Sequence, residues 1–158
     1  MRKKVMTILG CVALAALTFA PAQADDTSPG PTIVAAPDGQ TTGFLTPAMV
    51  AVTGQPLNFV NADALALHNV ISCHTASNGS NACDIRPDGS APWCYPASNF
   101  YLPGRCPLFW SPLKVIGNPT PIYGLDDGYA ITGRTYQFYC EPHKTAMTGT
   151  LVLLPNPT

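Results

Sequence analysis

The sequence is poor in charge and leaves little room for long helices. Charged side chains make up 11% of the 158 residues, with eight Lys and Arg against nine Asp and Glu. A nucleic-acid-binding surface needs clustered Lys and Arg, so a nucleic-acid partner is disfavoured. The 17 prolines and 13 glycines interrupt the chain too often for long helices. Short apolar segments bounded by Gly, Pro, Asn and Asp are instead typical of an all-β sandwich or barrel.

The first 24 residues predict a secretory signal peptide. A positively charged start precedes an apolar run, and Ala22-Gln23-Ala24 has the small-x-small pattern of a cleavage site. The run is too short and one-sided for a lasting membrane span. The alternative is a lipoprotein lipidated at Cys11, which is disfavoured because the apolar stretch before it is short. We therefore expect residues 25–158 to form one exported domain, periplasmic or extracellular, monomeric and without a membrane span.

Four of the cysteines after the predicted signal peptide lie close together in the sequence, and a fifth lies apart from them. Without Cys11 the chain keeps an odd number, and an oxidising compartment favours pairing. Four of them lie within 73–106, a segment without strand periodicity that we interpret as an insertion ordered by disulfides: Cys73, Cys83, Cys94 and Cys106. Four cysteines allow three pairings. We favour the nested one, Cys73 with Cys106 and Cys83 with Cys94, because it closes the base of the loop. Cys140 then stays unpaired.

Short strands are expected on both sides of this insertion. Their predicted ranges are 32–35, 44–52, 57–61, 67–72, 120–125, 134–140 and 148–154. In the segment 134–140, alternation places Tyr136 and Phe138 on the face that also carries Cys140. The simplest role of these two rings is in the core.

Metal-binding side chains follow that strand closely. The segment 139–147 reads Tyr-Cys-Glu-Pro-His-Lys-Thr-Ala-Met, so Cys140, His143 and Met147 lie in one short loop. A thiolate, imidazoles and a weak axial thioether are the ligands of a trigonal copper site for electron transfer. The loop lacks a second histidine, and His68 supplies it if its strand ends beside the loop, as a Greek-key sandwich permits.

These motifs resemble the plastocyanin-like cupredoxins. Four segments carry the resemblance. They are the Leu-His-Asn-Val sequence at 67–70, the cysteine and histidine segment at 136–143, the strand and turn that precede His68 at 54–63, and the closing strand that begins at 147. It covers about residues 40–72 and 107–154. It implies a Greek-key β-sandwich and one mononuclear type 1 copper ion that shuttles single electrons between transient redox partners. The implied copper ligands are His68, Cys140, His143 and Met147.

The resemblance also implies roles for residues around the ligands. Asn69 is expected to brace the ligand loop by hydrogen bonds. Tyr139 is expected to face outward beside the cysteine and to offer an electron path. Apart from the resemblance, outer-sphere electron transfer makes the exposed edge of His143 and the apolar surface around it the expected docking patch, with Pro142, Pro107 and Leu108 as candidates to frame it.

The sequence departs from the family in two places. Three residues separate His143 from Met147, whereas plastocyanin-like loops often have four and amicyanin-like loops two. Met147 is therefore the weakest of the four ligand assignments. The alternative role for its side chain is packing in the core. The insertion at 73–106 has no counterpart in the small plastocyanins.

Other functions stay open at this point. The same four ligands would serve a copper storage or delivery protein, and a metal-free binding module would use the insertion as its working surface. An enzyme is disfavoured, because copper oxidases and nitrite reductases need further histidines and only His74 is left.

Overall fold

The computed structural model describes residues 30–87, 93–99, 102–126 and 128–157. The predicted signal peptide and Cys11 lie outside these residues, as does Asp127, the middle residue of the turn that the Asp-Asp-Gly sequence at 126–128 predicts. Within them, the chain is almost entirely β strands and loops. No helix in this part of the chain has the length and apolar character needed to cross a bilayer.

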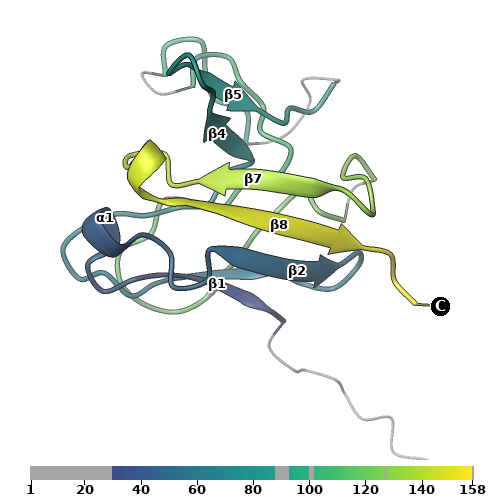
Figure 1. The fold of residues 1–158 in the computed structure, drawn as a ribbon, viewed down its shortest axis with the longest axis horizontal. Helices are drawn as coiled ribbons and strands as arrows, with labels where there is room; N and C mark the ends of the chain where they lie inside the picture. Colours follow the sequence, from purple (N-terminus) through teal and green to yellow (C-terminus); the bar gives the residue numbers. More distant parts are fainter. Residues whose placement is uncertain (1–29, 88–92, 100–101, 127, 158) are drawn as a thin grey trace, which may run out of the picture.

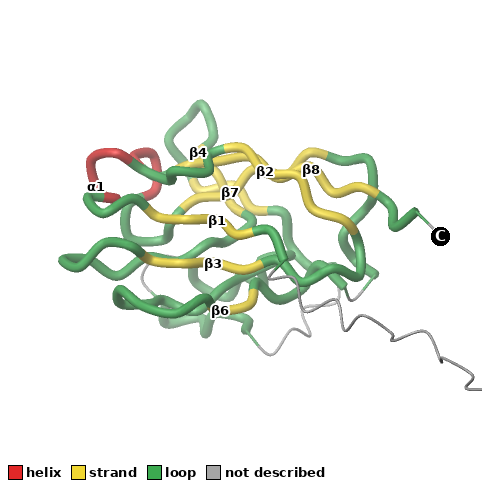
Figure 2. The backbone as a smooth tube through the Cα atoms, turned by 90° about the horizontal axis from the view of Figure 1, so that it is seen from below, coloured by secondary structure: helices red, strands yellow, loops and turns green. Residues whose placement is uncertain are grey.

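Two three-stranded sheets form the body of the protein (Figures 1 and 2). The first has the order β1-β3-β6, with β1 parallel to β3 and β3 antiparallel to β6. The second has the order β2-β8-β7, with β2 parallel to β8 and β8 antiparallel to β7. Their strands are β1 (Thr32–Ala35), β3 (Asn58–Asn61), β6 (Thr120–Pro121), β2 (Ala48–Val52), β8 (Thr148–Leu154) and β7 (Thr135–Tyr139). The expected all-β sandwich is confirmed.

The core lies between the two sheets because each strand buries alternate side chains. Ile33 of β1 and Phe59 of β3 face Phe138 of β7 and Leu151 of β8 in one cluster of buried residues. Phe44 joins the sheets, with its ring in edge contact with Phe59 at 6.5 Å and with Phe138 at 5.2 Å between centroids. Tyr136, Phe138 and Cys140 belong to this same cluster, as the alternation predicted.

Several predicted strands are shorter than expected. The segment 44–52 is a strand only from Ala48, with Phe44 in an isolated bridge to Ala35. The segment 67–72 forms isolated bridges rather than a strand, and 120–125 keeps only two strand residues. Two short helical turns were not predicted: α1 (Gly39–Thr42) and the 3-10 turn η1 (Lys144–Ala146). They lie at the same end of the sandwich (Figure 1).

The insertion has regular structure, and its disulfides differ from the prediction. A β hairpin of β4 (Cys73–Thr75) and β5 (Asn81–Cys83) places Cys73 opposite Cys83, and these two residues are bonded. The second disulfide joins Cys94 to Cys106. The nested pairing is therefore wrong, because hairpin register, rather than the base of the loop, brings the sulfurs together. Cys140 is the free cysteine of the described residues.

Gly149 provides a test of how β8 packs on its neighbours. A Cβ atom here would collide with the ring of Phe138 and lie 2.8 Å from the carbonyl oxygen of Pro47. We expect Gly149→Ala to lower the free energy of unfolding, measured in urea, by about 1–3 kcal/mol because of this overpacking. Thr148→Ala, at an exposed neighbour in the same strand, is the control and should change it by less than about 0.5 kcal/mol. Equal stability of the two variants would contradict this packing.

Candidate metal centre

His68 is placed by the loop that follows β3. Its backbone N–H donates to the carbonyl of Lys114 at 3.1 Å, and the Lys114 N–H donates back at 2.9 Å. The Asn61 amide at the end of β3 donates to the carbonyls of Ala66 and Lys114 at 2.8 and 2.7 Å. These bonds hold the loop in place, and the strand predicted for 67–72 is replaced by isolated bridges.

Strand β7 ends at Tyr139, directly before Cys140. The backbone N–H of Cys140 donates to the carbonyl of Met147 at 3.0 Å, which closes the loop between them. The N–H groups of His143 and Lys144 donate to the Cys140 carbonyl at 3.2 and 2.7 Å. The loop is therefore tight, and it presents the side chains of Cys140 and His143 on the same side.

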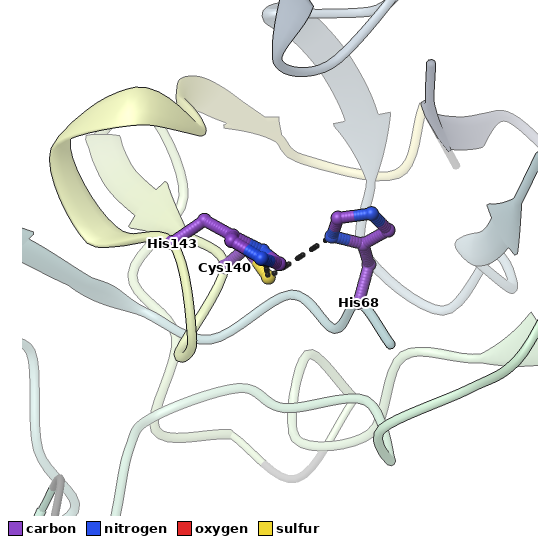
Figure 3. A group of neighbouring side chains, drawn as sticks. All are labelled: His68, Cys140 and His143. Atoms are coloured by element: carbon purple, nitrogen blue, oxygen red, sulfur yellow. Dashed lines mark hydrogen bonds between the residues drawn. The ribbon is translucent and has the colours of Figure 1, made fainter. Parts of the chain in front are cut away.

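Three metal-binding atoms converge at this end of the sandwich (Figure 3). The Sγ atom of Cys140 lies 3.5 Å from Nδ1 of His68 and 3.4 Å from Nδ1 of His143. All three ligand atoms lie within 4.8 Å of one another. The two imidazole rings are 4.6 Å apart between centroids. Among the described residues this is the one such group of His, Cys, Asp and Glu side chains.

This spacing fits a trigonal metal ion. Metal bonds of about 2.3 Å to sulfur and about 2.0 Å to nitrogen, at about 120°, place sulfur and nitrogen about 3.7 Å apart. The observed distances of 3.5 and 3.4 Å are close to that value. One thiolate and two imidazoles are moreover the equatorial donor set of electron-transfer copper sites.

Met147 is buried beside the same group. Its side chain is 0% exposed and belongs to the core cluster that contains Cys140. A Cβ atom added to Gly39 of α1 would lie 3.2 Å from the Met147 methyl carbon and 2.8 Å from Nε2 of His68. The thioether and the His68 ring thus border the same stretch of α1. Axial ligation by Met147 stays a prediction.

Burial shifts the pKa values of Cys140 and His143. Removal from water raises the pKa of Cys140 to about 11, with the nearby Glu141 charge adding to the rise. The backbone N–H groups of Asn69 and His143 oppose that rise. Burial, followed by the nearby His68, lowers the pKa of His143. A metal ion must therefore displace the Cys140 proton, whereas His143 is already favoured as a neutral donor.

A buried carboxylate supports His68 from behind. Oδ2 of Asp63 lies 2.9 Å from Nε2 of His68, and both side chains are almost completely buried. The hydrogen bond to His68 is the main reason that the pKa of Asp63 is lowered. The sequence analysis missed this partner, although Asp63 stood in the quoted approach to His68. Its distance of five residues carries no periodic signal, so only the folded loop identifies it.

Asn69 joins the two halves of the site. Its Oδ1 accepts the backbone N–H of Glu141 at 2.8 Å, and its Nδ2 donates to Glu141 Oε2 at 3.2 Å. The hydroxyl of Tyr95, in the insertion, donates to the same carboxylate oxygen at 2.6 Å. The roles of Glu141 and Tyr95 were not predicted, because each depends on a neighbour remote in sequence.

Comparison with solved structures was made for the whole chain. A purple cupredoxin from Nitrosopumilus maritimus is 16% identical, over 78% of this chain and 98% of that one, with a TM-score of 0.47. Auracyanin A, a "blue" copper protein from Chloroflexus aurantiacus, is 25% identical over 77% and 95%, with a TM-score of 0.49. Amicyanin from Paracoccus versutus is 14% identical over 82% and 86%, with a TM-score of 0.44.

These similar structures are cupredoxins. No family model and no curated protein matches the sequence.

The surroundings of the site differ from two expectations, one for Tyr139 and one for the docking patch. Tyr139 is 0% exposed and packs with Ile71 and with residues of the insertion, including Leu102, so it does not face outward. Pro107 and Leu108 are buried and cannot frame a docking patch. Pro142 and His143 are half-buried. His74 lies in β4 and is not part of the group formed by His68, Cys140 and His143.

Asn69→Ala tests the brace between the two ligand segments. The change removes both hydrogen bonds to Glu141 and leaves buried polar groups without that partner. We expect the free energy of unfolding of the metal-free protein, measured in urea, to fall by about 1–3 kcal/mol. Asn78→Ala removes an exposed asparagine whose Oδ1 accepts hydrogen bonds from the N–H and the hydroxyl of Ser80 in its own turn. A loss no larger than that of this control would show that the brace is not structural.

Proposed function

We propose that this chain is a type 1 copper protein that carries single electrons. His68, Cys140 and His143 would hold the ion, with Met147 as a weak axial ligand. The observation that carries this proposal is an unpaired, buried thiol within 3.5 Å of two imidazole nitrogens. When bound, copper supplies a Cu(II)/Cu(I) couple that accepts one electron from a reduced partner protein and passes it to an oxidised one.

The chain's own residues support this role by holding the ligands in place. The tight loop from Cys140 to Met147 and the Asn69 brace to Glu141 restrict movement of the ligand side chains. A donor set that keeps its geometry in both oxidation states needs little reorganisation at each transfer. The core on which the loop rests includes the large rings of Tyr136 and Phe138.

Burial favours an electron carrier over a copper delivery protein. His68, Cys140 and Met147 are each 0% exposed, so an acceptor protein has no direct access to three of the four proposed ligands. The half-buried ring of His143 is the remaining contact with the surface. Pro142 beside it and the exposed Leu67 next to His68 offer apolar surface for a short, transient contact with a redox partner.

The two disulfides and the predicted signal peptide support export. Stable disulfides form in oxidising compartments. We therefore propose that residues 25–158 act as one periplasmic or extracellular domain. The thiol of Cys140 would be protected from disulfide exchange there by its burial and by the bound ion.

Copper titration tests the proposal directly. Addition of Cu(II) to the purified protein should produce an intense visible thiolate-to-copper band that saturates at one equivalent. Cys140→Ser keeps the size of the side chain and should abolish the band, because the hydroxyl is a poor copper ligand. The band should bleach on reduction and return on oxidation with the copper retained. A colourless wild-type protein, or Cys140 found in a disulfide, would refute the proposal.

Met147→Leu tests axial ligation. Loss of a weak sulfur donor should keep the visible band and raise the reduction potential, because Cu(II) is the oxidation state that gains more from the donor. A tenfold change in relative affinity corresponds to about 59 mV for a one-electron couple, and a rise of that order is expected by voltammetry. Met49→Leu, at the edge of the same core, is the control. Equal potentials for the two variants would exclude Met147 as a ligand.

A further inference from the structure

The carboxylate of Asp63 is held rigidly against the His68 ring. Its Oδ2 accepts the backbone N–H of Gly39 at 3.1 Å and lies 2.9 Å from Nε2 of His68. Its Oδ1 accepts the N–H of Leu65 at 2.8 Å. The backbone of Asp63 is tied as well, since its own N–H donates to Asn61 Oδ1 at 2.8 Å. Both carboxylate oxygens are therefore committed, and the group has no freedom to turn away.

This contact determines which nitrogen of His68 carries the proton. A carboxylate accepts hydrogen bonds, so Nε2 must be the protonated nitrogen in the neutral ring. The bare Nδ1 then faces the Cys140 sulfur at 3.5 Å. The backbone of α1 packs against the same edge of the ring, because a Cβ atom at Gly39 would lie 2.8 Å from Nε2. The ring is thus ordered in the tautomer needed for metal binding.

The two histidines differ in this respect. His68 is fully buried with an ionic partner that is itself 2% exposed, so little water screens the pair. His143 is half-buried, and within the described ranges no carboxylate contacts it in this way. A negative charge behind only one imidazole makes that ring the stronger donor of the pair.

We propose that Asp63 is a positioning residue that fixes the His68 tautomer and lowers the reduction potential of the copper site. This inference rests on the proposed function. The negative charge, transmitted through the Nε2–H hydrogen bond, increases the donor strength of Nδ1. A stronger donor stabilises Cu(II) more than Cu(I). Removal of the charge therefore weakens Cu(II) binding and raises the potential.

Asp63→Asn is the test of the electronic effect. Partners of this kind change metal affinity by about 10–100-fold. We expect Cu(II) affinity to fall by at least about tenfold more than Cu(I) affinity, which corresponds to a rise of about 59 mV, with the visible band retained. Asp38→Asn removes an exposed carboxylate next to Gly39 at the start of α1. This control keeps the wild-type potential. If Asp63→Asn and Asp38→Asn have the same potential, the inference is wrong.

The metal-free protein provides a measurement that does not depend on copper. Nitrogen NMR of the His68 ring should show the proton on Nε2 in the wild type. In Asp63→Asn the amide can donate to Nε2, so the proton should shift toward Nδ1. A wild-type ring protonated on Nδ1 would overturn the inference even if Asp63→Asn fails to fold. If copper produces no visible band but the ring has the expected tautomer, the copper function fails and the positioning role of Asp63 stands.

Discussion

The contacts between the Cys140 sulfur and the Nδ1 atoms of His68 and His143 are the constraint on which the site depends. They exist only because Cys140 is left out of the disulfides, which close within the insertion. They also need two distant segments to meet, one after β3 and one after β7. The strand pairing of each sheet and the shared core between them bring these segments to one end of the sandwich.

The side chains of the candidate metal centre are supported from two independent directions. Asp63 and the backbone of α1 hold the ring of His68 from the outer side. Asn69 connects the His68 segment to the loop of Cys140 through both the backbone and the carboxylate of Glu141. The first support governs the ring and its tautomer, whereas the second governs the distance between the segments. Together these contacts order the side chains of His68 and Cys140. Burial by itself would keep the Cys140 thiol protonated.

The insertion changes the surroundings of the site rather than its ligands. Tyr95 contributes a hydrogen bond to Glu141, and Tyr95, Cys83 and Trp110 pack against the cluster that contains Tyr139. Trp110 in turn stacks with Trp93 of the insertion at 6.5 Å between centroids. The face beside the cysteine, where an exposed tyrosine was expected, is thereby covered. Surface contact of the ligand group is concentrated at the half-buried ring of His143.

The features that depend on neighbours along the chain could be predicted from the amino-acid sequence. The bounds of β1 and β8 match the short apolar segments predicted at 32–35 and 148–154, and the buried face of β7 follows from alternation. The close spacing of Cys140 and His143 follows from their shared loop. The partner of His68, the burial of Tyr139 and the pairing of Cys73 with Cys83 became known from the folded chain. The reason is that each of these depends on loop conformation and strand register, which bring together residues that no local period relates.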